Sequence, residues 1–308
     1  MTTPATNQTI SADDEIDLRE LFAILWKGKW IIIAITFVFA VGSVLYALSL
    51  PNIYQAEAKL APTKESQDGG LGAMAGQLGG LASLAGINMP RGQVDNAQMA
   101  QEILKSRAFI TEFVQKREIL ADLMAAEEWN PVTGEIQYAP EIYDIEANTW
   151  VRNVTPPRQV VPTAWEYVEE FRKILNISQD SATSIVTIRI EHVSPVIAKK
   201  WVEWLVEDIN NEMRRRDIEE AQRSIAYIER ELESARLANT QQVYASLLEQ
   251  QTQTIMLANI RPEYVFRVID PAVVPEVKIK PRRFLFLFFS LFLGLFFSTA
   301  IVLIKRLV

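Results

Sequence analysis

Side chains able to perform acid–base or metal chemistry are scarce in this chain of 308 residues. It has one histidine, His192, and no cysteine. A catalytic triad needs a nucleophile beside a base, and a zinc site needs several imidazole, thiolate or carboxylate ligands. We therefore predict no catalytic residue, no metal site and no cofactor-binding site, and we interpret His192 as a structural histidine.

Two acidic pairs and one basic run are the other candidates for chemistry. Glu127 and Glu128 are adjacent, as are Glu169 and Glu170. A glycosidase needs two carboxyl groups that face each other across a sugar, whereas neighbours on a helix point in different directions. The basic run 214–216 lies among acidic residues, which is typical of a solvated face. These patterns favour a scaffold over an enzyme.

The glycines do not form a nucleotide-binding loop. Eight of the twelve lie between Gly69 and Gly92, but no G-K-[ST] sequence follows them. We interpret this segment as a loop of undefined role. The net charge of −7 and the lack of a basic block argue against nucleic acid as a partner.

Two long apolar runs indicate how the chain is placed relative to a membrane. Residues 30–50 and 284–304 contain no charged side chain, and each is long enough to cross a hydrocarbon core of about 30 Å. We interpret both as transmembrane helices. Residues 1–29 and 305–308 then share one side, which we take to be the cytoplasm, and 51–283 form a single domain on the other side.

The domain between the two runs has the pattern of an α+β fold. Period-two alternation predicts strands, and apolar residues at spacings of three and four predict helices. Residues 129–162 are rich in proline and turn signals and should be irregular. The expected strands are 54–61, a hairpin over 174–192 and 264–269, and the expected helices are 95–124, with a break near Ser106, and 164–175. A short amphipathic helix is expected from Asp13.

A long helix is predicted over residues 195–260, which contain no glycine and no internal proline. Unbroken, it would reach about 100 Å. Within it a heptad seam is formed by Ile218, Ile225, Ile228 and Leu232. The register drifts beyond Ala235, which indicates either a bend or a turn between two antiparallel helices. The seam could pair with a neighbouring subunit or pack within one chain.

The order of these parts resembles the bacterial polysaccharide co-polymerases, the Wzz chain-length determinant family. The likeness covers essentially the whole chain and is most specific at the approach to the second apolar run. Ser298 stands where the family has a second glycine, and Lys280 where it has a serine. Arg282 stands where the family has a lysine, so a basic residue is preserved there, as a small one is at Ser298. The residues at the positions of the family pattern, for which we expect polymerase contact or packing between membrane helices, are Pro271, Pro275, Pro281, Arg282, Gly294 and Ser298.

This resemblance implies a membrane-proximal α/β base with a long projecting helix, in the inner membrane and periplasm. It implies a homo-oligomeric ring that sets the modal length of lipopolysaccharide O-antigen, a lipid-linked glycan, together with a Wzy-type polymerase. With only residues 305–308 after the second run and no Walker motif, we expect the type without a fused tyrosine kinase. The alternatives are a capsule or exopolysaccharide co-polymerase, and a periplasmic adaptor of an exporter.

Overall fold

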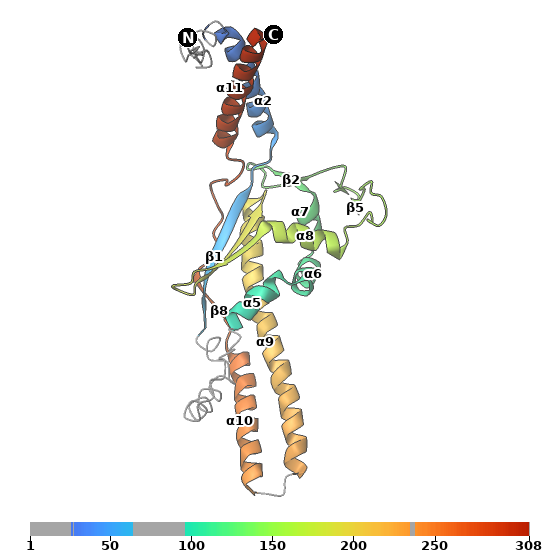
Figure 1. Cartoon of the computed structure of the whole chain (residues 1–308). Helices are drawn as coiled ribbons and strands as arrows, with labels where there is room; N and C mark the ends of the chain where they lie inside the picture. Colours follow the sequence, from blue (N-terminus) through green and yellow to red (C-terminus); the bar gives the residue numbers. More distant parts are fainter. Residues whose placement is uncertain (1–25, 27, 64–95, 235–237, 308) are drawn as a thin grey trace, which may run out of the picture. The chain divides into compact units, whose positions relative to one another are not determined.

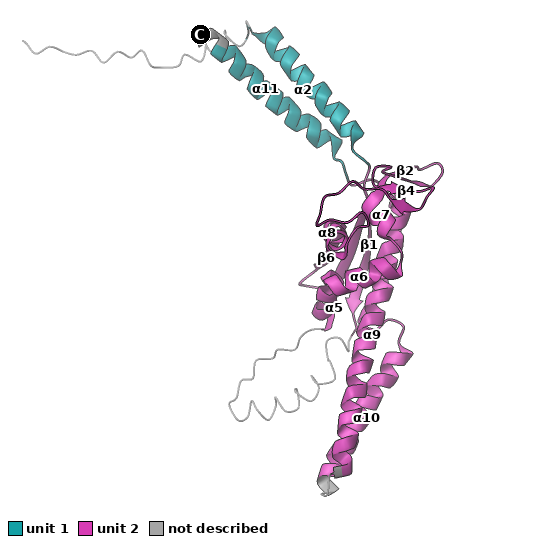
Figure 2. Ribbon diagram, turned by 90° about the vertical axis from the view of Figure 1, so that its right-hand side faces the viewer, with its two compact units in different colours: residues 1–51, 280–308 teal, residues 52–279 magenta. Residues whose placement is uncertain are grey.

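The chain is organised in two compact units, described here from a computed structural model. The structure describes residues 26, 28–63, 96–234 and 238–307. One unit combines Met1–Pro51 with Lys280–Val308, and the other is Asn52–Ile279 (Figure 2). The helix expected from Asp13 and the glycine-rich segment 69–92 lie outside the described residues.

The first unit is a pair of apolar helices packed along each other, α2 (Lys29–Ser49) and α11 (Arg283–Leu307). Their mean hydropathies of 2.6 and 2.5 and their lengths make both candidate membrane spans. Most of their apolar side chains are exposed, as expected where the surroundings are lipid. The two helices that the apolar runs predict are confirmed.

The second unit is built on a four-stranded antiparallel sheet in the order β6–β7–β1–β8. Strand β1 pairs with β7 from Tyr54 opposite His192 to Leu60 opposite Val186. The predicted hairpin and the first and last strands are therefore confirmed. The strands are β1 (Tyr54–Pro62), β6 (Leu175–Gln179), β7 (Val186–His192) and β8 (Phe266–Asp270).

Helices cover one face of this sheet and form the core with it (Figure 1). The alternate residues Val186, Ile188 and Ile190 are fully buried on that face. The predicted break is confirmed, because the Ser106 side chain accepts a hydrogen bond from the Phe109 N–H and starts a new helix. The helices are α5 (Asn96–Lys105), α6 (Arg107–Lys116), α7 (Leu120–Ala125), α8 (Ala164–Ile174) and α9 (Pro195–Ser234).

The long helical stretch is divided in two. Helix α9 runs for 40 residues, about 60 Å, and α10 (Ala238–Ile260) returns beside it (Figures 1 and 2). The prediction of one unbroken helix over 195–260 with a reach of about 100 Å is therefore wrong, and the alternative of two antiparallel helices is confirmed. An antiparallel partner lets each helix bury its apolar stripe, which a single rod would leave in water.

The segment expected to be irregular contains two small sheets. Strand β2 (Ala126–Trp129) pairs with β3 (Ile136–Tyr138), and β4 (Tyr143–Asp144) pairs with β5 (Thr149–Trp150). These strands are too short to show alternation. Aromatic contacts join them instead, since the Tyr143 ring packs edge-on against Tyr138 and at a tilt against Trp150.

Candidate functional site

Small residues allow the two apolar helices of the first unit to approach closely. A Cβ atom at Gly294 of α11 would lie 3.1 Å from the Phe39 Cβ and 3.1 Å from the Thr36 Cα of α2. Ser298, one turn further along, is fully buried, and its hydroxyl donates to the Leu295 carbonyl. Gly294 therefore packs against the chain's own first apolar helix, as small residues do between membrane helices.

The other residues of the expected polymerase contact are divided between the two units. Pro271 and Pro275 follow β8 in the second unit, whereas Pro281 and Arg282 immediately precede α11 in the first. Pro271 and Arg282 are exposed. Their role in contacting another protein stays a prediction.

The predicted heptad seam lies between α9 and α10 of the same chain. Ile228 and its neighbour Ala221 are buried, while Ile218, Ile225 and Leu232 are half-buried. Ala258 of α10 is fully buried as well. The seam is therefore used within the chain, and its role between subunits stays a prediction.

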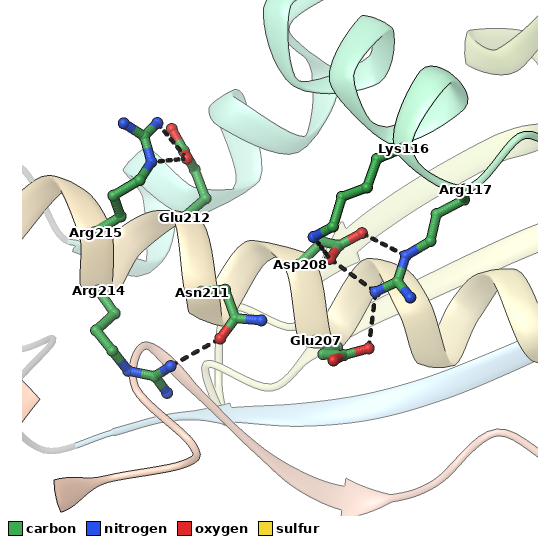
Figure 3. Close-up of polar contacts among 8 residues, drawn as sticks. All are labelled: Lys116, Arg117, Glu207, Asp208, Asn211, Glu212, Arg214 and Arg215. Carbon is green, nitrogen blue, oxygen red and sulfur yellow. Dashed lines mark hydrogen bonds and ion pairs between the residues drawn. The ribbon is translucent and has the colours of Figure 1, made fainter. Parts of the chain in front are cut away.

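A network of charges joins α6 to α9 (Figure 3). Asp208 of α9, almost fully buried, accepts from Lys116 Nζ at 2.8 Å and from the Arg117 guanidinium at 2.8 and 3.0 Å. Arg117 also bonds the Glu207 carboxylate at 2.8 Å and stacks on the ring of Trp204. The hydrogen bond that Arg117 donates to Asp208 raises the pKa of Arg117, against the effect of burial. The network anchors the C-terminal end of α6 to the long helix.

A second charge cluster lies one turn further along α9. The Glu212 carboxylate accepts from Arg215 at 2.6 Å (Figure 3). It also accepts from Arg216 at 2.5 Å, and Arg215 reaches Glu219 at 2.7 Å. Burial opposes the charge on Glu212, but the two arginines outweigh it and the pKa of this carboxyl is lowered. Arg215 and Arg216 thus have acidic partners on their own helix, in agreement with a mixed-charge face.

One face of α9 holds the chain that returns from α10 to β8. The buried Asn210 side chain accepts from the N–H groups of Tyr264, Val265 and Phe266 at 2.9–3.0 Å. Its amide donates to the carbonyls of Val206 and Phe266. Sequence reasoning missed this residue, because an asparagine within a helix is unremarkable until its distant partners are known.

The same face continues through Arg214 and Asp217. Arg214 donates to the carbonyls of Arg261 and Pro262, just beyond the end of α10. The Tyr264 hydroxyl donates to the Asp217 carboxylate at 2.5 Å. Burial raises the pKa of Asp217 despite that hydrogen bond. These contacts fix where α10 ends and β8 begins.

The geometry of His192 agrees with a structural histidine. Its Nδ1 accepts from the Ser194 N–H and its Nε2 donates to the Asp122 carbonyl, each at 3.0 Å. Burial lowers its pKa and keeps the ring neutral. Ser194 lies directly before α9, so this contact helps to position the start of the long helix. Among the described residues, no group of three or more potential metal ligands is found.

Two known families match the chain. A model described as "Chain length determinant protein" (Wzz) matches residues 14–117, and one described as "G-rich domain on putative tyrosine kinase" (GNVR) matches residues 222–307. The second match takes in the end of α9, all of α10, β8 and nearly all of α11. No curated protein matches the sequence.

Solved structures that match the chain include a "full-length bacterial polysaccharide co-polymerase". It is 14% identical, with a TM-score of 0.40, and the match covers 94% of this chain and 97% of that one. A fragment of WzzB, a polysaccharide co-polymerase from Salmonella Typhimurium, is 13% identical with a TM-score of 0.31. That match covers 74% of this chain and 100% of the fragment.

Proposed function

We propose that the chain sets the modal length of lipopolysaccharide O-antigen, because residues 14–117 match the Wzz chain length determinant family. Members of this family regulate polymerisation and are not catalysts, so the chain is a regulator. The match to the chain-length domain is the observation that carries the proposal.

The proposed location is the bacterial inner membrane. Support comes from the two candidate spans, α2 and α11, which flank the second unit in the sequence. In this arrangement both termini lie in the cytoplasm and the second unit lies in the periplasm, where it is available to a growing glycan.

The proposed partners are further copies of the chain, arranged in a ring, and a Wzy-type polymerase that extends a lipid-linked glycan. We assign the polymerase contact to the exposed segments around Pro271 and Arg282 and to the α2–α11 pair with Gly294. Between their charged ends the two helices carry no charged side chain, so they can meet another membrane protein mainly through their shape. Gly294 contributes indirectly, because it lets α2 and α11 pack closely and so sets the shape of the pair.

The test is a deletion of the gene in its own host, followed by electrophoresis of the extracted lipopolysaccharide. We expect the wild-type strain to show bands clustered around one chain length. In the deletion strain the band intensity should instead decay smoothly with chain length. Complementation with Gly294→Leu should fail to restore the cluster, because Phe39 and Thr36 leave no room for the side chain. Gly42→Leu is the matched control, since no atom lies within 4 Å of a Cβ at that position.

Size-exclusion chromatography of both variants shows whether they still assemble. An unchanged ladder after the deletion would contradict the proposed function. If the Gly294→Leu variant restores the clustered ladder, the importance of the helix pair is contradicted, but the proposed function is not.

A second candidate is supported by the match to the GNVR domain at residues 222–307, whose description refers to a tyrosine kinase. This second candidate function is the co-polymerisation of a capsule or exopolysaccharide. The size distribution of secreted polysaccharide from the same deletion strain separates the two, since it changes only under the second candidate.

A further inference from the structure

Two hollows adjoin each other on the surface of the second unit, and together they are named the α6 groove. The larger, of about 660 Å³, is shallow and open to solvent, and it is lined by the outer face of α6 alone, between Arg107 and Lys116. The smaller, of about 150 Å³, lies between α6 and α9, where Asp208 and Glu212 line it. Glu112 and Lys116 line both hollows.

The charges of the α6 groove balance. Three cationic and three anionic side chains line it, namely Arg107, Lys116 and Arg215 with Glu112, Asp208 and Glu212. A polyanion would meet as much repulsion as attraction there. A purely apolar ligand would remove charged groups from water without replacing their hydrogen bonds. A neutral ligand rich in hydroxyl groups avoids both costs, because a hydroxyl can donate to a carboxylate and accept from a cation.

An exposed aromatic ring lies next to Arg107, a residue that lines the larger hollow of the α6 groove. Trp165 of α8 is 61% exposed, and the Arg107 guanidinium lies 4.4 Å from the centre of its ring. A tryptophan offers a flat apolar surface, and its indole N–H can donate a hydrogen bond. The C–H face of a pyranose ring is apolar while its rim carries hydroxyls, so a sugar fits such a surface.

The groove also offers polar side chains with hydrogen-bonding capacity to spare. Thr111, Glu112 and Gln115 make no side-chain hydrogen bond or ion pair within the described part of the chain. Asp208 and Glu212 are held in place by their arginine and lysine partners. The groove thus combines pre-positioned carboxylates with unused donors and acceptors.

We propose that the α6 groove binds a neutral segment of the polysaccharide whose length the protein regulates. This inference rests on the proposed function and adds to it a place on the chain where the glycan is held. Trp165 stacks on one sugar ring, and Glu112 and Gln115 bond the hydroxyls of the next.

The test uses the full chain in lipid nanodiscs and saturation-transfer NMR. The probe is lipid-free O-antigen fragments of one to five repeats, prepared from the host's own lipopolysaccharide. We expect saturation transfer to the fragments and a dissociation constant that is measurable by titration. The double variant Glu112→Ala, Gln115→Ala and the single variant Trp165→Ala should each weaken binding about tenfold, the effect of losing 1–2 kcal/mol of contact free energy.

Exposed alanine substitutions in a helix preserve folding, which the thermal midpoint verifies. Glu249→Ala on α10, a helix that lines neither hollow, is the matched control and should bind like the wild type. Failure of the wild type to bind the fragments would overturn the inference, as would equal binding by all variants or binding of polyphosphate in place of glycan. The proposed function is judged separately, by the lipopolysaccharide ladder of the deletion strain.

Discussion

Replacement of Asn210 by leucine tests how the α9–α10 hairpin is joined to the sheet. The two side chains are similar in size, so the substitution removes hydrogen bonds without opening a large cavity. Three N–H groups, those of Tyr264, Val265 and Phe266, lose their acceptor, and the groups of Val265 and Phe266 are buried. The Val206 and Phe266 carbonyls lose a donor.

The size of the effect follows from these lost partners. A buried donor left without a partner costs about 1–3 kcal/mol. Two fully buried donors and one partly buried donor, less the gain from burying an apolar side chain, give a loss of about 4 kcal/mol. For a unit of this size, 1 kcal/mol corresponds to about 2–4 °C, so the melting temperature should fall by roughly 10 °C.

The assay is thermal unfolding of the full chain in detergent, with tryptophan fluorescence as the signal that monitors unfolding. The matched control is Asn211→Leu. Asn211 is exposed and accepts only from Arg214, at 2.7 Å, so we expect a change of less than about 2 °C. The reasoning is refuted if the two variants melt within about 3 °C of each other.

The remaining predictions concern the buried histidine and the charge network. Because burial lowers the pKa of His192, its stabilising contribution is complete above its unfolded pKa of about 6.5 and declines as the pH falls towards the folded pKa. Urea midpoints at pH 7.5 and 5.5 should therefore differ more for the wild type than for His192→Gln, and equal differences would contradict this. Asp208→Asn should destabilise the chain by about 2 kcal/mol, since it leaves the half-buried Arg117 without its main charged partner. Glu207→Gln, whose carboxylate is exposed, should cost under about 1 kcal/mol, and similar urea midpoints for these two variants would count against a buried network.

Local pattern was sufficient for most of the secondary structure. The apolar runs, the alternation in β1 and β7 and the break at Ser106 each depend on residues close together in the chain, so their signals can be read without knowing the fold. Edge-on and tilted aromatic contacts join the short strands between 136 and 150, and period-two alternation is too brief there to detect.

The candidate site was only partly visible in the sequence. Gly294 was chosen as a packing residue, and its close approach to α2 follows from the lack of a side chain at that position. The α6 groove could not have been predicted, because it depends on α6, α8 and α9 lying together although they are separated by tens of residues.

The sequence by itself determined that two apolar helices flank an α+β unit with a long charged helical stretch, because spacing and hydrophobicity act between near neighbours. Only the tertiary structure decided that this stretch folds back on itself and buries its own heptad seam. The deciding contacts join Asn210 and Arg214 to residues 261–266, about fifty positions away. Such contacts depend on the geometry of the whole unit, and no local pattern in the sequence records them.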